Sequence, residues 1–270
     1  MKEFRIDFHT HWDAKSYGSS DSDPSRFLEM LDIHGLDRAV ILPTRSLMDA
    51  GQIFSDNREV ALAGQRSKGR LIPLGTVNLW NEPEALRETR LCFEELAMAG
   101  LKFHPWLQGA SVNLLTMDKV CDILEEFGGI AYFHDGTPPF SLPAQIGLLA
   151  ARHPNVRFVL GHCGLLEYWR ESLMVLQNCP NVWGCICGPS HAAARTILQE
   201  GPHDRLMWGS DFGFGLMDHI AFRLKELKAW ELSPEDEERL IVKNPSRLLR
   251  EIYAGSDRTL SPSETAYARP

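Results

Sequence analysis

The stretch IDFHTH at residues 6–11 is a short apolar segment that closes on two histidines, and similar segments recur along the chain. Each apolar run is rich in β-forming residues and is followed by a stretch with helical periodicity. Near-continuous apolar strands separated by amphipathic helices are typical of a parallel sheet covered by helices. We predict eight strands, at residues 4–9, 38–43, 71–78, 100–105, 130–134, 156–161, 182–188 and 205–209.

The connecting segments carry the signals of helices, and we predict four of them at residues 24–33, 82–99, 117–127 and 234–252. Asp23 is the expected N-cap of the first helix and Ser233 that of the last, each followed by a proline. Eight strand–helix units favour a closed (β/α)8 TIM barrel of the α/β class. An open doubly wound sheet is the alternative, but no Gly-x-Gly-x-x-Gly follows an early strand.

Length and composition indicate a single domain. The chain has 270 residues, 44% of them hydrophobic, and barrels of this kind run to about 250 residues as one domain. We assign residues 1–254 to the barrel domain. Residues 255–270 turn to Ser, Thr, Pro and Arg, and we expect this polar tail to be poorly ordered.

Charge and cysteine usage exclude several classes of partner and location. The net charge of −8 argues against nucleic acid and membrane-surface partners, which favour a basic face. Without a secretory signal pattern or an apolar stretch of about 20 residues, we expect a cytoplasmic protein with no membrane span. The six cysteines are scattered, so no disulfide framework is indicated. Cys185 and Cys187 alternate on a strand, and we interpret them, like Cys163, as buried packing residues.

The two histidines of the first strand form half of a metal site. His9 and His11 lie two residues apart, so their side chains share one face of the strand. Two neutral imidazoles from one short segment suit Zn²⁺ or a similar ion. The alternative is that one of the two histidines is a solvated loop residue.

Three further polar residues follow apolar strands in the same way. His134 and His162 close the predicted fifth and sixth strands, and Asp211 follows the eighth. Barrel enzymes build their sites at the carboxyl ends of the strands. Each residue alone is explained by a hydrogen-bonded loop position, but a shared metal ion would satisfy all of these buried polar groups together.

These residues lie in motifs that resemble the amidohydrolase superfamily, and within it the amidohydrolase-related group that includes decarboxylases and lactonases. The resemblance spans nearly the whole chain in order. It rests on DFHTH at 7–11, GLKFHP at 100–105, FHDG at 133–136, LGHCG at 160–164, GSDF at 209–212 and NPSRLL at 244–249.

The resemblance implies a site with one divalent metal ion, for which zinc is the commonest choice in the family and manganese the alternative. The implied metal ligands are His9, His11, His134 and Asp211. His162 would lie beside the metal and assist catalysis, and Asp211 would also accept a proton from water at the metal. A small-molecule substrate is implied, and relatives are often homodimers.

Lys102 is the ambiguous residue of the fourth strand. In binuclear relatives a lysine on this strand is carboxylated and bridges two metals, but the Lys-Phe-His-Pro form is usual in the group without that role, so we expect one metal. Lys102 and His104 share a strand face and are expected to line the substrate pocket instead.

Other residues beside the predicted site are candidates for binding substrate. Arg45 could pair with a substrate carboxylate, or could be a surface arginine. Asp13 and Asp135 are candidates to orient a histidine. Aromatic rings would suit a flat or cyclic substrate, although barrel rims also simply pack aromatics; the rings concerned are Trp12, Trp106, Phe212 and Phe214.

The site predicts a metal-dependent hydrolase, in which activated water attacks an ester, lactone or amide carbonyl. His162 and Asp211 would manage the protons. A non-oxidative decarboxylase on the same scaffold is the first alternative, because it uses the same residues. A metal-free barrel that binds a ligand without turnover is the second.

Overall fold

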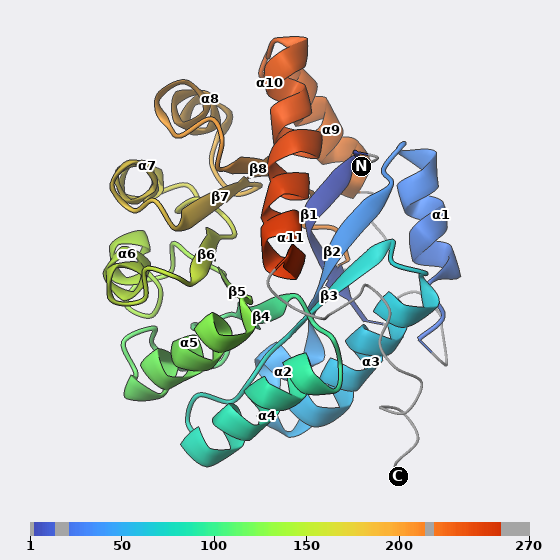
Figure 1. Ribbon diagram of the computed structural model, residues 1–270. Coiled ribbons are helices and arrows are strands. Elements are labelled where there is room, and N and C mark those ends of the chain that lie inside the picture. Colours follow the sequence, from blue (N-terminus) through green and yellow to red (C-terminus); the bar gives the residue numbers. More distant parts are fainter. Residues whose placement is uncertain (1–2, 14–21, 214–218, 255–270) are drawn as a thin grey trace.

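The computed structural model describes residues 3–13, 22–213 and 219–254, and within them the eight predicted parallel strands are confirmed. Neighbours in the sheet follow chain order, as in a (β/α)8 barrel (Figure 1). The strands are β1 (Ile6–Trp12), β2 (Arg38–Pro43), β3 (Leu71–Gly75), β4 (Gly100–Phe103), β5 (Ile130–Phe133), β6 (Arg157–Leu160), β7 (Val182–Ile186) and β8 (Leu206–Trp208).

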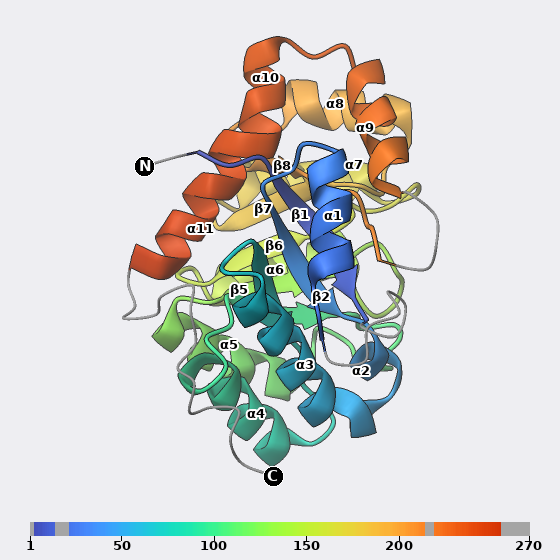
Figure 2. The same ribbon diagram turned by 90° about the vertical axis from the view of Figure 1, so that its right-hand side faces the viewer.

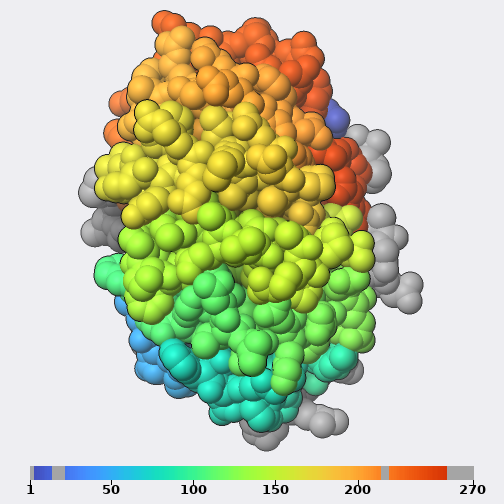
Figure 3. Space-filling view, turned by 90° about the vertical axis from the view of Figure 1, so that its left-hand side faces the viewer, coloured from blue at the N-terminus to red at the C-terminus, as the bar shows by residue number. Residues whose placement is uncertain are grey.

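Helices form the outer layer, and Figure 3 shows them as successive bands in chain order across one face of the molecule. The helical segments are α1 (Ser25–Ile33), α2 (Arg45–Met48), η2 (Ala50–Gln52), α3 (Ile53–Arg66), α4 (Glu82–Glu94), α5 (Leu115–Phe127), α6 (Pro143–Arg152), α7 (Trp169–Asn178), α8 (His191–Glu200), α9 (His219–Ala229), α10 (Pro234–Glu238), η3 (Arg239–Lys243) and α11 (Asn244–Ala254). No described helix has the length and hydropathy of a membrane span.

A helical segment is present where the last helix was predicted, but it is not a single α-helix. Ser233 accepts a hydrogen bond from the backbone N–H of Asp236, which confirms the predicted cap. The π-helical turn η3 then joins α10 to α11, and Figure 2 shows the three as one continuous rod. Leu248 and Ile252 of α11 pack into the inner apolar cluster beside Ile6, so this helix covers the amino-terminal end of the barrel.

Two other helix boundaries differ from the prediction. Helix α4 ends at Glu94 rather than at 99, and Met98 and Ala99 enter the core just before β4. Asp23 accepts a hydrogen bond from the backbone N–H of Ser25 at 3.0 Å, although Pro24 occupies the N-cap position of α1. The predicted tail at 255–270 lies outside the described residues.

Strand β1 extends further than predicted. Part-way along it, the side chains that point into the barrel switch from one alternating set to the other. Ile6 and Phe8 belong to the inner apolar cluster, so strict alternation would turn His9 outward. The pairing of β1 with β2 shifts by one residue between Asp7 and Thr10. Such a bulge re-aims side chains next to active sites. It turns the His9 ring inward, where the ring centroid lies 5.2 Å from that of Tyr132.

Candidate metal centre

His9 and His11 meet Asp211 at the carboxyl ends of β1 and β8. The Nε2 atoms of the two imidazoles lie 3.3 Å apart, and the Oδ1 atom of Asp211 lies 3.4 Å from the first and 3.3 Å from the second. A tetrahedral ion with bonds of about 2.0–2.1 Å separates its ligand atoms by about 3.3–3.4 Å. The three donor atoms are therefore spaced as they would be on one face of a metal coordination shell.

The junction between β8 and β1 holds these donors in register. The backbone N–H of Asp211 donates to the carbonyl oxygen of His9 at 2.8 Å, and the Asp211 φ angle is +59°. Asp7 accepts hydrogen bonds at one oxygen from the N–H groups of His9, at 3.2 Å, and Ser210, at 2.9 Å. Gly209 is needed because a Cβ there would lie 2.6 Å from that of His9. One buried carboxylate thus ties both ligand-bearing segments together.

Electrostatics keep the donors in the states that bind a cation. Burial lowers the pKa of His9 and of His11, so both imidazoles are neutral and offer lone pairs. Burial alone would raise the pKa of Asp211, but its contacts with the neighbouring His9 and His11 hold it well below its usual range. The site therefore presents two neutral nitrogens and one carboxylate.

His134 lies beside this triangle rather than in it. Among the described residues, two groups of three donor atoms lie within 4.8 Å of one another, one of His9, His11 and Asp211 and one of His9, His162 and Cys187, and His134 is in neither. The His134 ring stacks on that of His104, with centroids 3.8 Å apart, and meets that of His162 edge-on at 4.3 Å. The structure thus brings three of the four predicted ligands to metal-binding distance and places the fourth next to His162.

His162 is anchored through its backbone by Asp135. The two carboxylate oxygens of Asp135 accept hydrogen bonds from the N–H groups of His162, at 2.7 Å, and of Gly164, at 2.6 Å. Burial lowers the pKa of His162 to about 3, so its ring is neutral. Asp135 therefore acts on His162, which is the sixth-strand histidine, rather than on its sequence neighbour His134.

Lys102 is fully buried inside the barrel. Its ammonium lies 4.8 Å from the centroid of the Tyr132 ring and has no hydrogen-bond partner among the described residues. Burial lowers its pKa to about 8. The charge of Lys102 also lowers the pKa of five neighbouring histidines, which we call the histidine cluster. They are His9, His11, His104, His134 and His162.

Cys187 belongs to the site, beyond the packing role that the sequence indicated. Its Sγ lies 3.4 Å from Nδ1 of His9 and 3.3 Å from Nδ1 of His162. Burial raises the pKa of this thiol well above its usual range. Its position just after β7, in phase with the polar residues that follow β5 and β6, is the signal that could have found it. Cys163, by contrast, is a buried packing residue, as predicted.

The predicted substrate residues fall in different places. His104 joins the histidine cluster, and Trp106 beside it is 58% exposed. The rings of Trp12 and Phe212 both pack on Phe27 of α1, in the apolar layer outside the barrel.

Arg45 lies apart from that cluster. Arg45 forms ion pairs with Asp56, at 3.2 Å, and with Glu59, and lies 3.9 Å from Asp13. These carboxylates already balance its charge. Phe214 lies outside the described residues.

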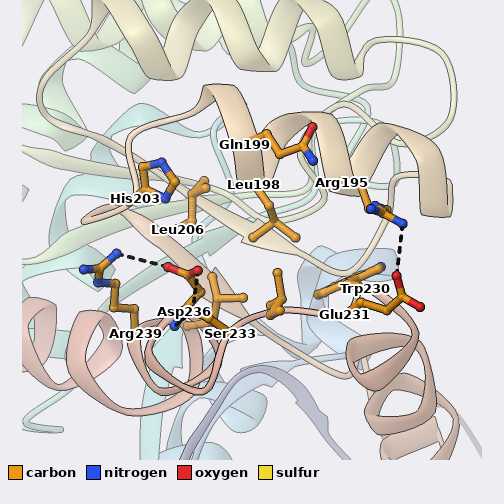
Figure 4. Close-up of a pocket in the computed structure, with 12 residues that line it drawn as sticks. Arg195, Leu198, Gln199, His203, Leu206, Trp230, Glu231, Ser233, Asp236 and Arg239 are labelled. Atoms are coloured by element: carbon orange, nitrogen blue, oxygen red, sulfur yellow. Dashed lines mark hydrogen bonds and ion pairs between the residues drawn. The ribbon is translucent and has the colours of Figure 1, made fainter.

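A separate cavity of about 350 Å³ lies near the amino-terminal end of β8, away from this cluster (Figure 4). Leu206 and Trp230 line it together with charged side chains. Arg195 pairs with Glu231 at 3.7 Å, and Arg239 pairs with Asp236 at 3.0 Å. Its charges are thus internally balanced, and it contains none of the predicted site residues.

The barrel and its donor set define a class: metal-dependent (β/α)8-barrel enzymes with histidine and carboxylate ligands at the strand ends. The amidohydrolase family model matches residues 6–250, and the chain belongs to this family. A search of curated protein sequences found no match.

Several solved structures share the fold at low sequence identity. A 2,6-dihydroxybenzoate decarboxylase from Rhizobium is 14% identical, with a TM-score of 0.70 over 92% of this chain and 99% of that one. A 5-carboxyvanillate decarboxylase from Sphingomonas paucimobilis is 16% identical, with a TM-score of 0.66 over 91% and 98%. A dihydroxybenzoic acid decarboxylase from Polaromonas, with bound manganese and 2-nitroresorcinol, is 15% identical, with a TM-score of 0.68 over 92% and 97%.

Proposed function

We propose that this protein is a metal-dependent, non-oxidative decarboxylase that acts on a small aromatic carboxylic acid. The observation that carries this proposal is Lys102, a buried ammonium without a hydrogen-bond acceptor among the described residues. A buried charge is costly unless it is paired, and a substrate carboxylate would pair it. The aromatic acids named for the structural neighbours are the source of the aromatic substrate class.

The metal site follows from the triangle of donors. His9, His11 and Asp211 would hold one divalent ion, with His134 proposed as the fourth ligand. Zinc suits the nitrogen-rich donor set, and manganese is bound in one of the neighbours. A bound ion would stabilise the negative charge that develops on the substrate.

The chain's own residues then bind the substrate and move one proton. Lys102 draws the carboxylate into the barrel, and the histidine stack of His104 and His134 offers a flat wall for an aromatic ring. The neutral His162 takes a proton from water at its free ring nitrogen and delivers it to the carbon that bears the carboxylate. The carbon–carboxylate bond breaks, its electron pair stays on that carbon, and CO2 leaves. No oxidant is consumed.

Hydrolysis is the second candidate, and the family's description as amidohydrolases favours it. In that reaction water attacks the carbonyl carbon of an ester, lactone or amide, and Asp211 would take the proton of the water. The bond from that carbon to the leaving oxygen or nitrogen breaks, and the leaving atom takes up the proton. Both reactions use the same metal-binding residues, so the products must distinguish them.

The first experiment measures those products. The metal-loaded protein is incubated with 2,6-dihydroxybenzoate, 5-carboxyvanillate and a panel of lactones in ¹⁸O-labelled water. We expect one CO2 per aromatic acid consumed and no ¹⁸O in the aromatic product. Acid release from a lactone with ¹⁸O incorporation, and no CO2 from any aromatic acid, would replace decarboxylation with hydrolysis.

The second experiment tests the ligand set by elemental analysis of the purified protein. We expect about one equivalent of metal in the wild type and a marked loss in His9→Ala and Asp211→Asn, because structural zinc sites lose their affinity without their ligands. His134→Ala should also lose metal if it is the fourth ligand. His153→Ala is the control, since His153 bonds Asp118 outside the site. Equal metal in all variants would place the site elsewhere.

A further inference from the structure

Besides its hydrogen bond with the Cys185 thiol, the thiol of Cys187 makes three polar contacts inside the barrel. Its Sγ lies 3.0 Å from the carbonyl oxygen of Gly161, 3.3 Å from Nδ1 of His162 and 3.4 Å from Nδ1 of His9. The residue is 3% exposed. Among the described residues, this thiol is the hydrogen-bond partner of the His162 ring.

Counting hydrogens assigns a direction to each contact. A carbonyl oxygen only accepts, so the S–H of Cys187 donates to Gly161. The sulfur lone pairs then face the two ring nitrogens, which must carry hydrogen for the contacts to be attractive. For His9, Nδ1 also lies 3.1 Å from the carbonyl oxygen of Gly161, and this contact likewise requires a hydrogen on Nδ1. That tautomer leaves Nε2 of His9 free for the metal, as the donor triangle requires.

Close packing holds the sulfur and the ring in place. A Cβ at Gly188, the next residue, would lie 2.6 Å from the backbone oxygen of His162. The end of β7 therefore rests directly on the residue that follows β6. Asp135 fixes the His162 backbone from the other side. His162 is thus held in place both at its backbone and at the Nδ1 atom of its ring.

We propose that Cys187 is a positioning residue that keeps the proton of His162 on Nδ1 and leaves Nε2 as the proton acceptor. The inference rests on the proposed function of His162 as the proton carrier. A neutral histidine in the other tautomer would have no lone pair at Nε2 and could not take up there the proton that it has to deliver to the substrate. The thiol acts through His162 and does not touch the reacting atoms.

A different use of the same atoms is a second metal site. His9, His162 and Cys187 offer three donor atoms within 4.8 Å of one another. The contact of Nδ1 of His9 with the Gly161 carbonyl favours the hydrogen-bonded arrangement, because a metal at that nitrogen would displace its hydrogen. The experiment below separates the two by metal content.

The test reads the tautomer directly. The zinc-loaded protein, labelled with ¹⁵N-histidine, is examined by long-range ¹H–¹⁵N NMR, and the His162 signals are assigned with His162→Gln. We expect Nδ1–H in the wild type and in Cys187→Ser, whose hydroxyl also donates to a carbonyl and accepts from an N–H. Cys187→Ala should show a mixture of tautomers. Cys121→Ala is the control, since it removes an equally buried thiol from α5, outside the site.

Activity and metal content complete the test. In Cys187→Ala we expect kcat to fall about tenfold to a hundredfold with KM nearly unchanged, and Cys187→Ser to restore it. An unchanged Nδ1–H tautomer in Cys187→Ala would overturn the proposal, as would the loss of one equivalent of metal, which would make the thiolate a ligand. If the wild type lacks decarboxylase activity, the proposed function fails while the NMR result still decides the positioning role.

Discussion

Asp135 illustrates how a single buried side chain organises the site at the scale of one residue. Its two oxygens accept hydrogen bonds from the N–H groups of His162 and Gly164, at the point where the chain leaves β6. Burial raises its pKa to about 6 despite those bonds, so the carboxylate is costly to keep. Such a group is retained where it fixes the position of a functional neighbour.

The substitution Asp135→Asn tests this role. The amide can still accept one hydrogen bond, but its NH2 group would face the other N–H, so one buried donor loses its partner. We expect a loss of about 1–3 kcal/mol in the free energy of unfolding and a lower kcat, measured by urea titration and by the CO2 assay. Asp122→Asn, at a carboxylate with 71% of its side chain exposed, should change neither. Wild-type values for Asp135→Asn would remove the anchoring role.

At the scale of elements, two glycines, one in β4 and one just after β8, allow effects on folding to be distinguished from effects on metal binding. A Cβ at Gly100 of β4 would lie 2.3 Å from the carbonyl oxygen of Ile130 on β5. A Cβ at Gly209, after β8, would lie 2.6 Å from the Cβ of His9. Both positions are overpacked by a single methyl group, but only the second one touches a proposed ligand.

Gly100→Ala and Gly209→Ala should therefore behave differently. Both should destabilise the fold by about 1–3 kcal/mol or more, the usual cost of overpacking, in chemical unfolding experiments. Only Gly209→Ala should also weaken metal binding, because His9 is displaced. Elemental analysis of the two folded variants at equal metal supply measures the difference. Equal metal content would mean that the junction of β8 and β1 tolerates the shift.

At the scale of the whole molecule, a bound metal ion would link the first and last strands of the barrel. His9 and His11 come from β1, whereas Asp211 follows β8. The ion would therefore stabilise the closed barrel over the unfolded chain by mass action, by about 2.7 kcal/mol when its free concentration is 100 times Kd.

Removal of the metal should lower the Tm of the wild type. For a chain of this size we expect a shift of roughly 5–10 °C after treatment with a chelator, followed by calorimetry. His9→Ala should show little response, because it has no ion to lose. Identical chelator shifts in the two proteins would indicate that the effect does not come from this site.

The sequence alone determined the class of the fold and predicted most of the residues that gather in the candidate site. Apolar strands recur with helical segments between them, and this periodicity is a local property of the chain. All eight predicted strands exist, although β1 runs on to Trp12 and several others end one to three residues early. The polar residues after the strands were visible for the same reason, since parallel strands bring their carboxyl ends to one rim.

The tertiary structure alone decided which of these residues meet and in what state. The bulge that turns His9 inward depends on pairing with β2, and the donor triangle depends on the contact of β8 with β1. The position of Cys187 just after β7 was visible in the sequence, but its role was not, because that role comes from rings that lie 25 and 178 residues away in the chain. Local patterns predict elements, whereas contacts between distant residues depend on how the barrel closes.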